Sequence, residues 1–245
     1  NFTTTYVVNK EARTLDLDSD VRYIGRHYVK DNAHTLGWEQ SGFEFSFYGT
    51  GATVTLSNIK SSTSSGSDRA YLNGYVDGVR QDYVTPAYEP TDDLFINGAD
   101  PHTFVLAKDL EEGQHTIKVI KRSGSMYNSV TIDNIYIHQS ENAQILEKPT
   151  APERKIAVFG DSISEGMGIL NGGGLPMNED PTLSYASLAA DAFGAEVSDA
   201  VAEGGIGVTK CSKTYTMGEV FDYVDYHNLG TEADNALYAF DSDPD

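Results

Sequence analysis

The stretch that most constrains what this chain can fold into is residues 155–168, where a short apolar run leads into a turn rich in glycine and serine. The run at 155–159 lacks a regular polar alternation, which predicts a short strand covered on both faces, as in a parallel sheet. Gly160 allows the backbone to bend where a side chain would collide. Ser162 therefore falls at the carboxyl end of a strand, where open α/β sheets carry their chemistry.

Two interpretations of this turn are open from its own residues. The hydroxyl of Ser162 can act as a nucleophile if a base reaches it and amide groups receive the oxyanion. Alternatively, Asp161 or Ser162 only caps the helix that follows. The sequence on either side of the turn favours the nucleophile.

The sequence Val-Phe-Gly-Asp-Ser-Ile-Ser-Glu-Gly at 158–166 resembles the first signature block of the SGNH (GDSL) hydrolases. The region in front of it resembles the front domain of carbohydrate esterase family two, in which a β-sandwich precedes an SGNH domain. The segments that carry this second resemblance are residues 24–26, 38–42, 71–78 and 113–122. The resemblance covers nearly the whole chain, but it includes only the first part of a hydrolase domain.

The pattern before residue 140 is that of an all-β domain. Short segments alternate apolar and polar residues, with turn signals at a spacing of roughly ten residues, which is typical of a sandwich or jelly roll. The expected strands include residues 1–10, 21–28, 43–47, 52–56, 71–76, 115–122 and 130–138. We expect a β-sandwich (jelly-roll) domain over 1–140, a proline-containing linker over 141–153, and the N-terminal part of an SGNH hydrolase domain over 154–245.

Residues 183–201 complete a strand–helix–strand unit after the serine block. Thr182 can cap a helix over 183–193, and Gly194 can end it before a second strand at 195–201. Two parallel strands joined by a helix are wound right-handed. The resemblance implies an α/β domain of the SGNH, flavodoxin-like type, whose sheet is truncated because only two of its strands can be identified here.

Glycines at 204, 205 and 207 follow this second strand. Their place after the serine block and the ending Gly-Ile-Gly-Val resemble the second hydrolase block. That resemblance implies an oxyanion hole formed by the amides of Ser162 and Gly205, with Gly204 as the second choice. The alternative is a plain glycine turn, whereas a phosphate-binding loop is a poor match because no Gly-Lys-Ser/Thr follows.

A serine nucleophile needs a base. The SGNH hydrolases supply a His and an oxyanion-hole Asn from later blocks, and we find neither block in this sequence. Suitable residue types stand in the wrong order or context at Asp225 with His227, at Asp31 with His34, and at Asn228. We therefore expect the catalytic His and the Asn to come from the remaining C-terminal part of the same domain, and these residues to be one piece of a longer chain.

The balance of charge is strongly acidic, with 37 Asp and Glu against 17 Lys and Arg and a formal net charge of −20. Such a surface argues against nucleic acid and anionic membranes as partners. The single cysteine excludes an internal disulfide and a cysteine-based metal cage. No apolar run approaches the roughly 18 residues that a membrane span needs. We expect an extracellular protein, secreted by a bacterium.

The family resemblance implies a serine esterase that removes O-acetyl groups from plant polysaccharides such as xylan and mannan. Its partner would be an acetylated polysaccharide or oligosaccharide, and it would need no metal and no organic cofactor. Gly160 and Asp161 would support the turn that holds Ser162. Two alternatives are a non-catalytic carbohydrate-binding protein with a degenerate hydrolase domain, and a lipase or thioesterase of the same superfamily, against which the lack of an apolar lid argues.

Overall fold

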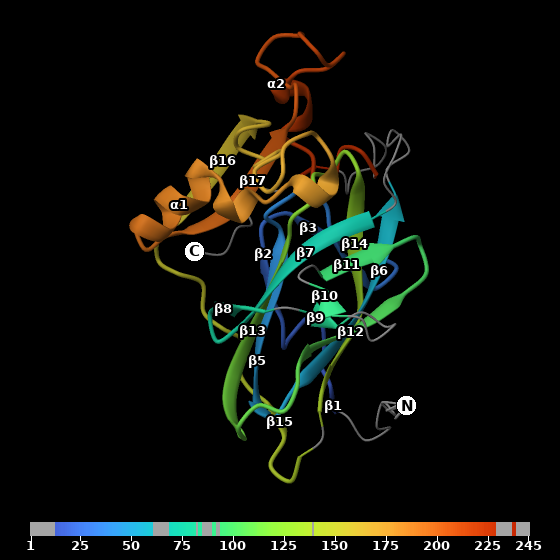
Figure 1. Ribbon diagram of the computed structural model, residues 1–245, viewed down its shortest axis with the longest axis vertical. Coiled ribbons are helices and arrows are strands. Elements are labelled where there is room, and N and C mark those ends of the chain that lie inside the picture. The colour runs from blue at the N-terminus through green and yellow to red at the C-terminus, as the bar shows by residue number, and fades with distance from the viewer. Residues whose placement is uncertain are drawn as a thin grey trace.

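The computed structural model describes residues 13–60, 69–81, 83–84, 90–91, 94–138, 140–228 and 237–238. The strand expected at 1–10 lies outside these residues. Two antiparallel sheets face each other and form an upright β-sandwich between Arg13 and Ile145 (Figure 1). The prediction of an all-β sandwich at the front of the chain is confirmed.

One sheet has six strands in the order β12-β6-β14-β4-β3, with β1 paired to β14. Its strands are β1 (Arg13–Thr14), β3 (His27–Lys30), β4 (Ala33–Leu36), β6 (Ala52–Lys60), β12 (His102–Ala107) and β14 (Asn128–Ile137). The other sheet has seven strands in the order β11-β7-β13-β5-β15, with β2 paired to β5 and β8 to β7. Its strands are β2 (Arg22–Ile24), β5 (Gly42–Gly49), β7 (Arg69–Val76), β8 (Val79–Arg80), β11 (Leu94–Asn97), β13 (Gly113–Lys121) and β15 (Gln144–Ile145). A short ribbon pairs β9 (Tyr83–Val84) with β10 (Pro90–Thr91).

The space between the two sheets is filled by apolar side chains from both. Phe43, Phe45 and Phe47 of β5 are fully buried and share one core with Leu56 of β6 and Ile117 of β13. Each such side chain stabilises the fold by roughly 1.5–3 kcal/mol through the apolar surface that it removes from water. The alternation in the sequence at 43–47 thus corresponds to a row of aromatic side chains in the core.

The single strand expected at 21–28 is instead divided into β2 and β3, so that prediction was wrong. Gly25 has a φ of +68°, and a Cβ placed there would lie 3.0 Å from the Cα of Ser41. At this bend the chain passes from one sheet to the other, because β2 pairs with β5 and β3 pairs with β4. The alternation of apolar and polar residues at 21–28 does not reveal that the chain changes sheet. Gly25 is nevertheless the kind of residue that permits such a bend.

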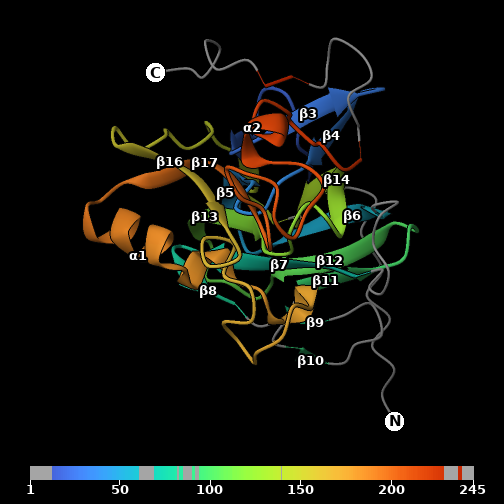
Figure 2. The same ribbon diagram turned by 90° about the horizontal axis from the view of Figure 1, so that it is seen from above.

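A smaller α/β unit, residues 154–228, lies at one end of the sandwich, opposite the end that carries β15 (Figure 1). Its two strands, β16 (Lys155–Asp161) and β17 (Glu196–Glu203), pair in parallel, and they are linked through α1 (Tyr185–Ala192). Viewed from above, α1 lies at the outer flank of the unit (Figure 2). The remaining helical segments are η1 (Pro176–Asn178), η2 (Pro181–Leu183) and α2 (Met217–Val220).

The two strands of this unit differ in how they are covered. On β17, Ala200 packs with the α1 residues Ala186 and Ala190, while its neighbour Val201 packs with Trp38 of the sandwich. The strand β16 is covered less completely, since Phe159 remains 44% exposed. The prediction that residues 155–159 are buried on both faces was therefore wrong, because Ala157 and Phe159 are exposed.

The helix of this unit begins two residues later than predicted. Asp180, not Thr182, accepts a backbone hydrogen bond at the start of the segment, and η2 precedes α1. Gly194 follows the helix with a φ of +61°, as the sequence predicted. Within the described part of the chain, no helix has the length and apolar character needed to cross a membrane.

The alternation on β13 gives a direct test of the sandwich core. We expect Ile117→Ala to lower the free energy of unfolding by about 2–5 kcal/mol, because Ile117 is fully buried between the sheets. The matched variant Gln114→Ala, at an exposed position of the same strand, should change it by no more than about 0.5 kcal/mol. Urea unfolding at constant pH measures both, and equal effects would contradict the assigned core face.

Candidate active site

The parallel pairing of β16 with β17 brings the two predicted site segments to one edge of the sheet. Asp161, the last residue of β16, stands opposite Glu203, the last residue of β17. Ser162 follows the first strand directly, and Gly204 and Gly205 follow the second. The serine turn (residues 160–168) and the glycine turn (residues 203–207) are therefore adjacent at the carboxyl ends of the strands, where α/β folds carry their sites.

Gly160 is the point at which the serine turn closes tightly on itself. A Cβ on Gly160 would lie 1.9 Å from the Oγ of Ser164, a separation that no real pair of atoms could keep. The Ser164 hydroxyl also forms a 3.0 Å hydrogen bond with the hydroxyl of Tyr185, at the start of α1. Only a glycine at position 160 allows Ser164 to take this place.

Asp161 forms hydrogen bonds that hold the turn around Ser162. Its Oδ1 accepts a hydrogen bond from the backbone N–H of Ile163 at 3.0 Å, and its carbonyl accepts one from Glu165 at 2.9 Å. The carbonyl of Ser162 accepts a further bond from the N–H of Met167 at 2.9 Å. Ser162 itself is half-buried, so its side chain is partly accessible to solvent.

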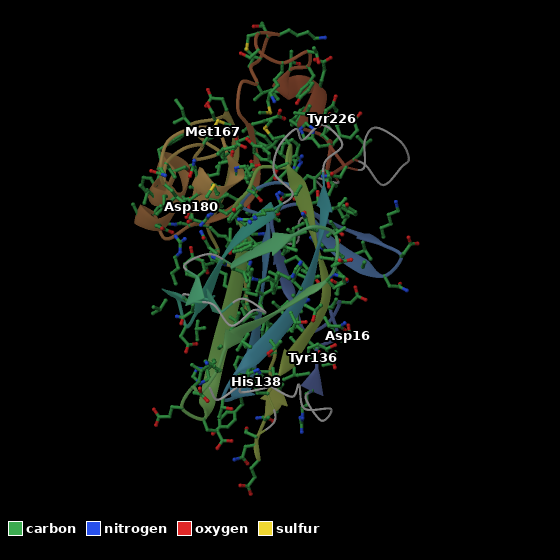
Figure 3. All side chains as sticks on the ribbon, turned by 45° about the vertical axis from the view of Figure 1, so that its right-hand side comes forward. Asp16, Tyr136, His138, Met167, Asp180 and Tyr226 are labelled. Atoms are coloured by element: carbon green, nitrogen blue, oxygen red, sulfur yellow. The ribbon has the colours of Figure 1, made fainter. Side chains whose placement is uncertain are left out.

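The glycine turn is shaped by two neighbouring close approaches. Gly205 has a φ of +80°, a backbone conformation that favours glycine. Its carbonyl accepts a hydrogen bond from the thiol of the exposed Cys211, at 3.4 Å. A Cβ on Gly204 would lie 2.2 Å from the Cε of Met167 in the serine turn. The two turns therefore pack directly against each other at Met167, which is labelled in Figure 3.

His227 and Asp225, the residues of the Asp-x-His sequence, contact groups other than Ser162. The Nε2 of His227 lies 2.8 Å from the Oε2 of Glu203, at the start of the glycine turn. The Oε1 of Glu203 accepts a hydrogen bond from the Tyr215 hydroxyl and pairs with Lys213. Burial alone would raise the pKa of Glu203, but the hydrogen bond from His227 and the contacts with Lys213 and Tyr215 lower it below its ordinary value. Asp225 instead accepts hydrogen bonds from the Ser129 hydroxyl and from Asn228.

The other histidines belong to the sandwich. His115 contacts Asp77 and the carbonyl of Glu111, which is the local partnership expected for a strand residue. His138 lies at the opposite end of the molecule from Met167 (Figure 3). Within the described residues, His34, His115, His138 and His227 contact partners other than Ser162.

Two arginines of the sandwich, one buried and one half-buried, hold β17 in place. Arg26, which is fully buried, donates two hydrogen bonds to the carboxylate of Asp199 at 2.7 and 2.9 Å. Arg22 makes a second two-pronged contact, with Glu196, at 2.8 and 2.7 Å. Paired bonds of this kind fix orientation as well as distance. Trp38 is also fully buried, so it is a core residue and not a sugar platform, and its indole N–H donates to the carbonyl of Tyr223 at 2.9 Å.

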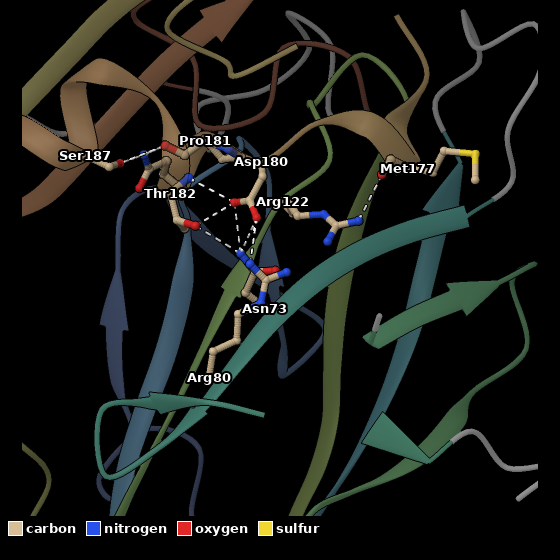
Figure 4. A network of polar contacts seen from close by, with 9 residues as sticks. Asn73, Arg80, Arg122, Met177, Asp180, Pro181, Thr182 and Ser187 are labelled. Atoms are coloured by element: carbon tan, nitrogen blue, oxygen red, sulfur yellow. Dashed lines mark hydrogen bonds and ion pairs between the residues drawn. The ribbon is translucent and has the colours of Figure 1, made fainter. Parts of the chain in front are cut away.

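A polar network ties the loop before α1 to the sandwich (Figure 4). Asp180 is fully buried and accepts hydrogen bonds from Asn73 at 3.0 and 3.1 Å, from Arg80 at 3.0 Å, and from Thr182. Nearby, the side-chain amide of Gln40 donates to the carbonyl of Pro181 at 2.9 Å and to the Ser187 hydroxyl. The same figure shows Arg122 donating to the carbonyl of Met177 at 3.1 Å.

A cluster of buried charged groups lies between the sandwich and the two turns. Glu39, Glu165 and Glu179 are essentially inaccessible to solvent, and so is Lys121. Burial raises the pKa of Glu39 to about 8 and that of Glu179 to about 7, and burial lowers the pKa of Lys121 to about 8. Glu39 also accepts a 2.7 Å hydrogen bond from the N–H of Ala202, next to the glycine turn.

Sequence reasoning missed this cluster of Glu39, Lys121 and Glu179. Each of these residues reads as a solvated charge in its own segment, because its neighbours in space come from distant parts of the chain. Glu165 lies inside the serine block, but nothing in the sequence indicates that its side chain is buried. Across the residues that the structure describes, no group of three or more His, Cys, Asp and Glu side chains is arranged to hold a metal ion.

Comparisons with known proteins find similarity to carbohydrate esterases. Residues 23–149 match the family model described as Carbohydrate esterase 2 N-terminal. The chain is 29% identical over 208 residues to the cellulase/esterase CelE of Acetivibrio thermocellus, covering 82% of this chain and 22% of that protein. It is 27% identical over 196 residues to an acetylxylan esterase / glucomannan deacetylase of Cellvibrio japonicus, covering 79% of this chain and 49% of that protein.

A solved structure with the same fold is a family two carbohydrate esterase from Clostridium thermocellum in complex with cellohexaose. It aligns with a TM-score of 0.71 and 24% identity, over 90% of this chain and 62% of that one. The chain thus spans less than two thirds of the length of each of these three relatives.

The close approach at Gly160 predicts the behaviour of two variants. Gly160→Ala should destabilise the protein by about 1–3 kcal/mol, since the new methyl group collides with the side chain of Ser164. Combining it with Ser164→Gly removes the atoms that collide and should recover part of this loss. Urea unfolding of both variants and of Ser164→Gly alone measures the coupling, and a purely additive double variant would contradict the contact.

The buried glutamates predict that stability depends on pH. The pKa of Glu39 is raised by burial to about 8, so between its ordinary value of 4.5 and 8 the native state keeps a proton that the unfolded chain releases. The free energy of unfolding should therefore fall as pH rises through this window. In Glu39→Gln this fall should be shallower, by up to about 1.4 kcal/mol per pH unit.

Urea unfolding at pH 5, 6, 7 and 8 measures this slope. Glu153→Gln, at an exposed position before β16, is the matched control and should retain the slope of the wild type. An unchanged slope in Glu39→Gln would show that Glu39 is already ionised in the native state at pH 5.

Proposed function

Because the chain belongs to the carbohydrate esterase 2 N-terminal family, we propose that it is part of a serine esterase that removes O-acetyl groups from plant polysaccharides such as xylan and mannan. The observation that carries the proposal is the adjacency of the serine turn and the glycine turn at the carboxyl ends of β16 and β17. This is where a nucleophile and the amides of an oxyanion hole would have to meet. The relatives named as an acetylxylan esterase / glucomannan deacetylase and as a cellulase/esterase support the substrate class.

In the proposed mechanism, the Oγ of Ser162 attacks the carbonyl carbon of the acetyl group while a base takes the hydroxyl proton. The amides of Ser162 and Gly205 donate hydrogen bonds to the oxygen on which negative charge develops. The protonated base then gives the proton to the departing sugar oxygen, leaving an acetyl group on Ser162. Water, activated by the same base, releases acetate and restores the serine.

Gly160 and Asp161 support this chemistry without taking part in it. Asp161 keeps the backbone of the turn in place through its bonds to Ile163 and Glu165. Gly160 provides the space that Ser164 occupies. The mechanism as proposed needs no metal and no organic cofactor, since each step is a proton transfer or an attack on a carbonyl group.

We propose that the base His and a third oxyanion donor, an Asn, come from the remaining C-terminal part of the same hydrolase domain. The proposed division is a sandwich domain over 1–140, a linker over 141–153 and the hydrolase part from 154. Three features support a continuing sheet: β16 has β17 as its partner within the described residues, Phe159 is 44% exposed, and Ile163 is 70% exposed. The structural relative of this family extends well beyond the aligned region.

The substrate and location are part of the proposal. An acetylated polysaccharide or oligosaccharide fits an acidic protein with a net charge of −20, because a neutral glycan is not repelled. We propose that the protein works outside a bacterial cell, where such polymers are found. In this proposal the sandwich acts as a support for the hydrolase part, because Trp38, the single tryptophan, is buried in the contact between them.

Replacement of Ser162 tests the proposal. In the full-length protein, Ser162→Ala should lower kcat/KM for acetate release from acetylated xylan and from p-nitrophenyl acetate by about a thousand-fold or more. The 245-residue chain alone should also be at least about a hundred-fold less active than the full-length protein, because it would lack one oxyanion donor as well as the base.

Ser140→Ala, in the loop after β14, is the matched control and should keep the activity of the wild type. Equal rates for Ser162→Ala and the wild type would remove the esterase proposal. In that case, binding of cellohexaose or xylan measured by calorimetry would support the alternative, a carbohydrate-binding protein with a degenerate hydrolase domain.

A further inference from the structure

The side chain of Glu165 reaches the glycine turn of the proposed active site and the sandwich. It belongs to the serine turn and is fully buried. Its Oε2 lies 3.5 Å from the position that a Cβ on Gly204 would take, so the carboxyl group reaches the backbone of the glycine turn. Its Oε1 lies 2.1 Å from the corresponding position on Gly124, in the loop between β13 and β14.

The surroundings of Glu165 disfavour a charged carboxylate. Neither of its oxygens has a hydrogen-bond partner among the described residues, and the Oε1 of Glu179 also lacks one. The Oε2 of Glu179 accepts a 3.0 Å hydrogen bond from the N–H of Gly124, so both carboxyl groups reach the same glycine. Burial, together with the neighbouring charges of Glu179 and Glu39, raises the pKa of Glu165 well above its ordinary value. A neutral carboxyl group can donate a proton that a carboxylate cannot.

We propose that Glu165 is a positioning residue for the esterase reaction, which holds the glycine turn at the correct spacing from the serine turn and locks both onto the sandwich at Gly124. The inference rests on the proposed function of Ser162 and Gly205. Glu165 does not touch the reacting atoms in this scheme. It acts through the backbone of Gly204, whose displacement would move the amide of Gly205.

The magnitude of such an effect follows from the geometry of catalysis. An oxyanion donor acts at about 2.7–3.1 Å from the oxygen that it stabilises, and a misplacement of about 1 Å can cost about a hundred-fold in rate. Ionisation of Glu165 would place a negative charge beside the carboxyl groups of Glu179 and Glu39, and like charges would push these elements apart. Catalysis should therefore decline when Glu165 loses its proton.

Several titratable or charged groups face Glu165 from every element packed around it. They are Glu39 before β5, Lys121 at the end of β13, Tyr127 in the following loop, Glu179 between η1 and η2, and Glu203 at the end of β17. Arg122 in turn lies close to Glu179. Glu203 is paired with Lys213 and His227, so its charge is offset locally. The positive charge of Lys121 opposes the effect of the carboxyl groups, which is why a direct test must change Glu165 alone.

The test compares Glu165→Ala and Glu165→Gln with the wild type in the full-length protein. Glutamine keeps the shape and donates hydrogen bonds but never becomes charged. We expect Glu165→Ala to lower kcat for p-nitrophenyl acetate by about 10- to 100-fold while KM changes little. Glu165→Gln should retain the kcat of the wild type at pH 6 and should lose the decline that the wild type shows at alkaline pH.

A role in stability alone would give different results. Glu165→Ala would then unfold at lower urea concentration but would keep the kcat of the wild type in the folded fraction, and that outcome would overturn the proposal. If Glu165→Ala does not fold, the pH profile of Glu165→Gln decides, and an alkaline decline identical to that of the wild type overturns it. Glu153→Gln serves as the matched control, because Glu153 is exposed and lies outside both turns.

Hydrogen–deuterium exchange separates this inference from the proposed function. We expect exchange at the peptide that contains Gly204 and Gly205 to be faster in Glu165→Ala, or in the wild type at alkaline pH, than in Glu165→Gln. This readout does not depend on activity. If Ser162→Ala hydrolyses esters as fast as the wild type, the esterase proposal fails, while faster exchange still supports the contact of Glu165 with the glycine turn. Unchanged exchange would overturn the contact itself.

Discussion

The position of β17 depends on two buried guanidinium–carboxylate contacts, and the site depends on β17. Arg22 lies on β2 and Arg26 in the bend between β2 and β3, and their partners Glu196 and Asp199 lie on β17. Burying such charges carries a large desolvation cost, which is offset only while both partners stay in contact. The contacts are therefore weak evidence for stability, but they strongly oppose any other register of β17 on the sandwich. Because β16 pairs with β17, the position of β17 also determines the spacing between the serine turn and the glycine turn.

The carboxyl groups behind the two turns are also buried, but they lack enough positively charged partners. Glu39, Glu165 and Glu179 outnumber the two nearby cations, Lys121 and Arg122, so they cannot all be charged without strong repulsion. Their raised pKa values express this excess of carboxyl groups. The protein thus holds protons at the contact between its two parts, which makes this contact sensitive to pH in a range where isolated carboxyl groups are already ionised.

The sequence predicted those features that depend on local pattern. Alternation located the aromatic core of β5, and the glycine–serine block with a following helix and strand predicted the parallel pair β16 and β17. Sequence reasoning failed where the decisive partner lies far away in the chain. The bend at Gly25, the exposed face of Phe159 and the buried charge of Lys121 each depend on which distant segment packs there. The roles of Ser162 and Gly205 remain predictions that the fold makes geometrically reasonable.

The way in which β17 is buried explains why the sandwich and the α/β unit cannot be treated as separate modules. An α/β sheet needs a packed layer on each face. Here α1 supplies one layer, through Ala186 and Ala190. The other face of β17 is covered by Trp38 of the sandwich together with Val220 of α2. Removing the sandwich would expose Val201 to water and leave Asp199 without its arginine, so the sandwich takes the place of a helical layer and is a structural part of the site.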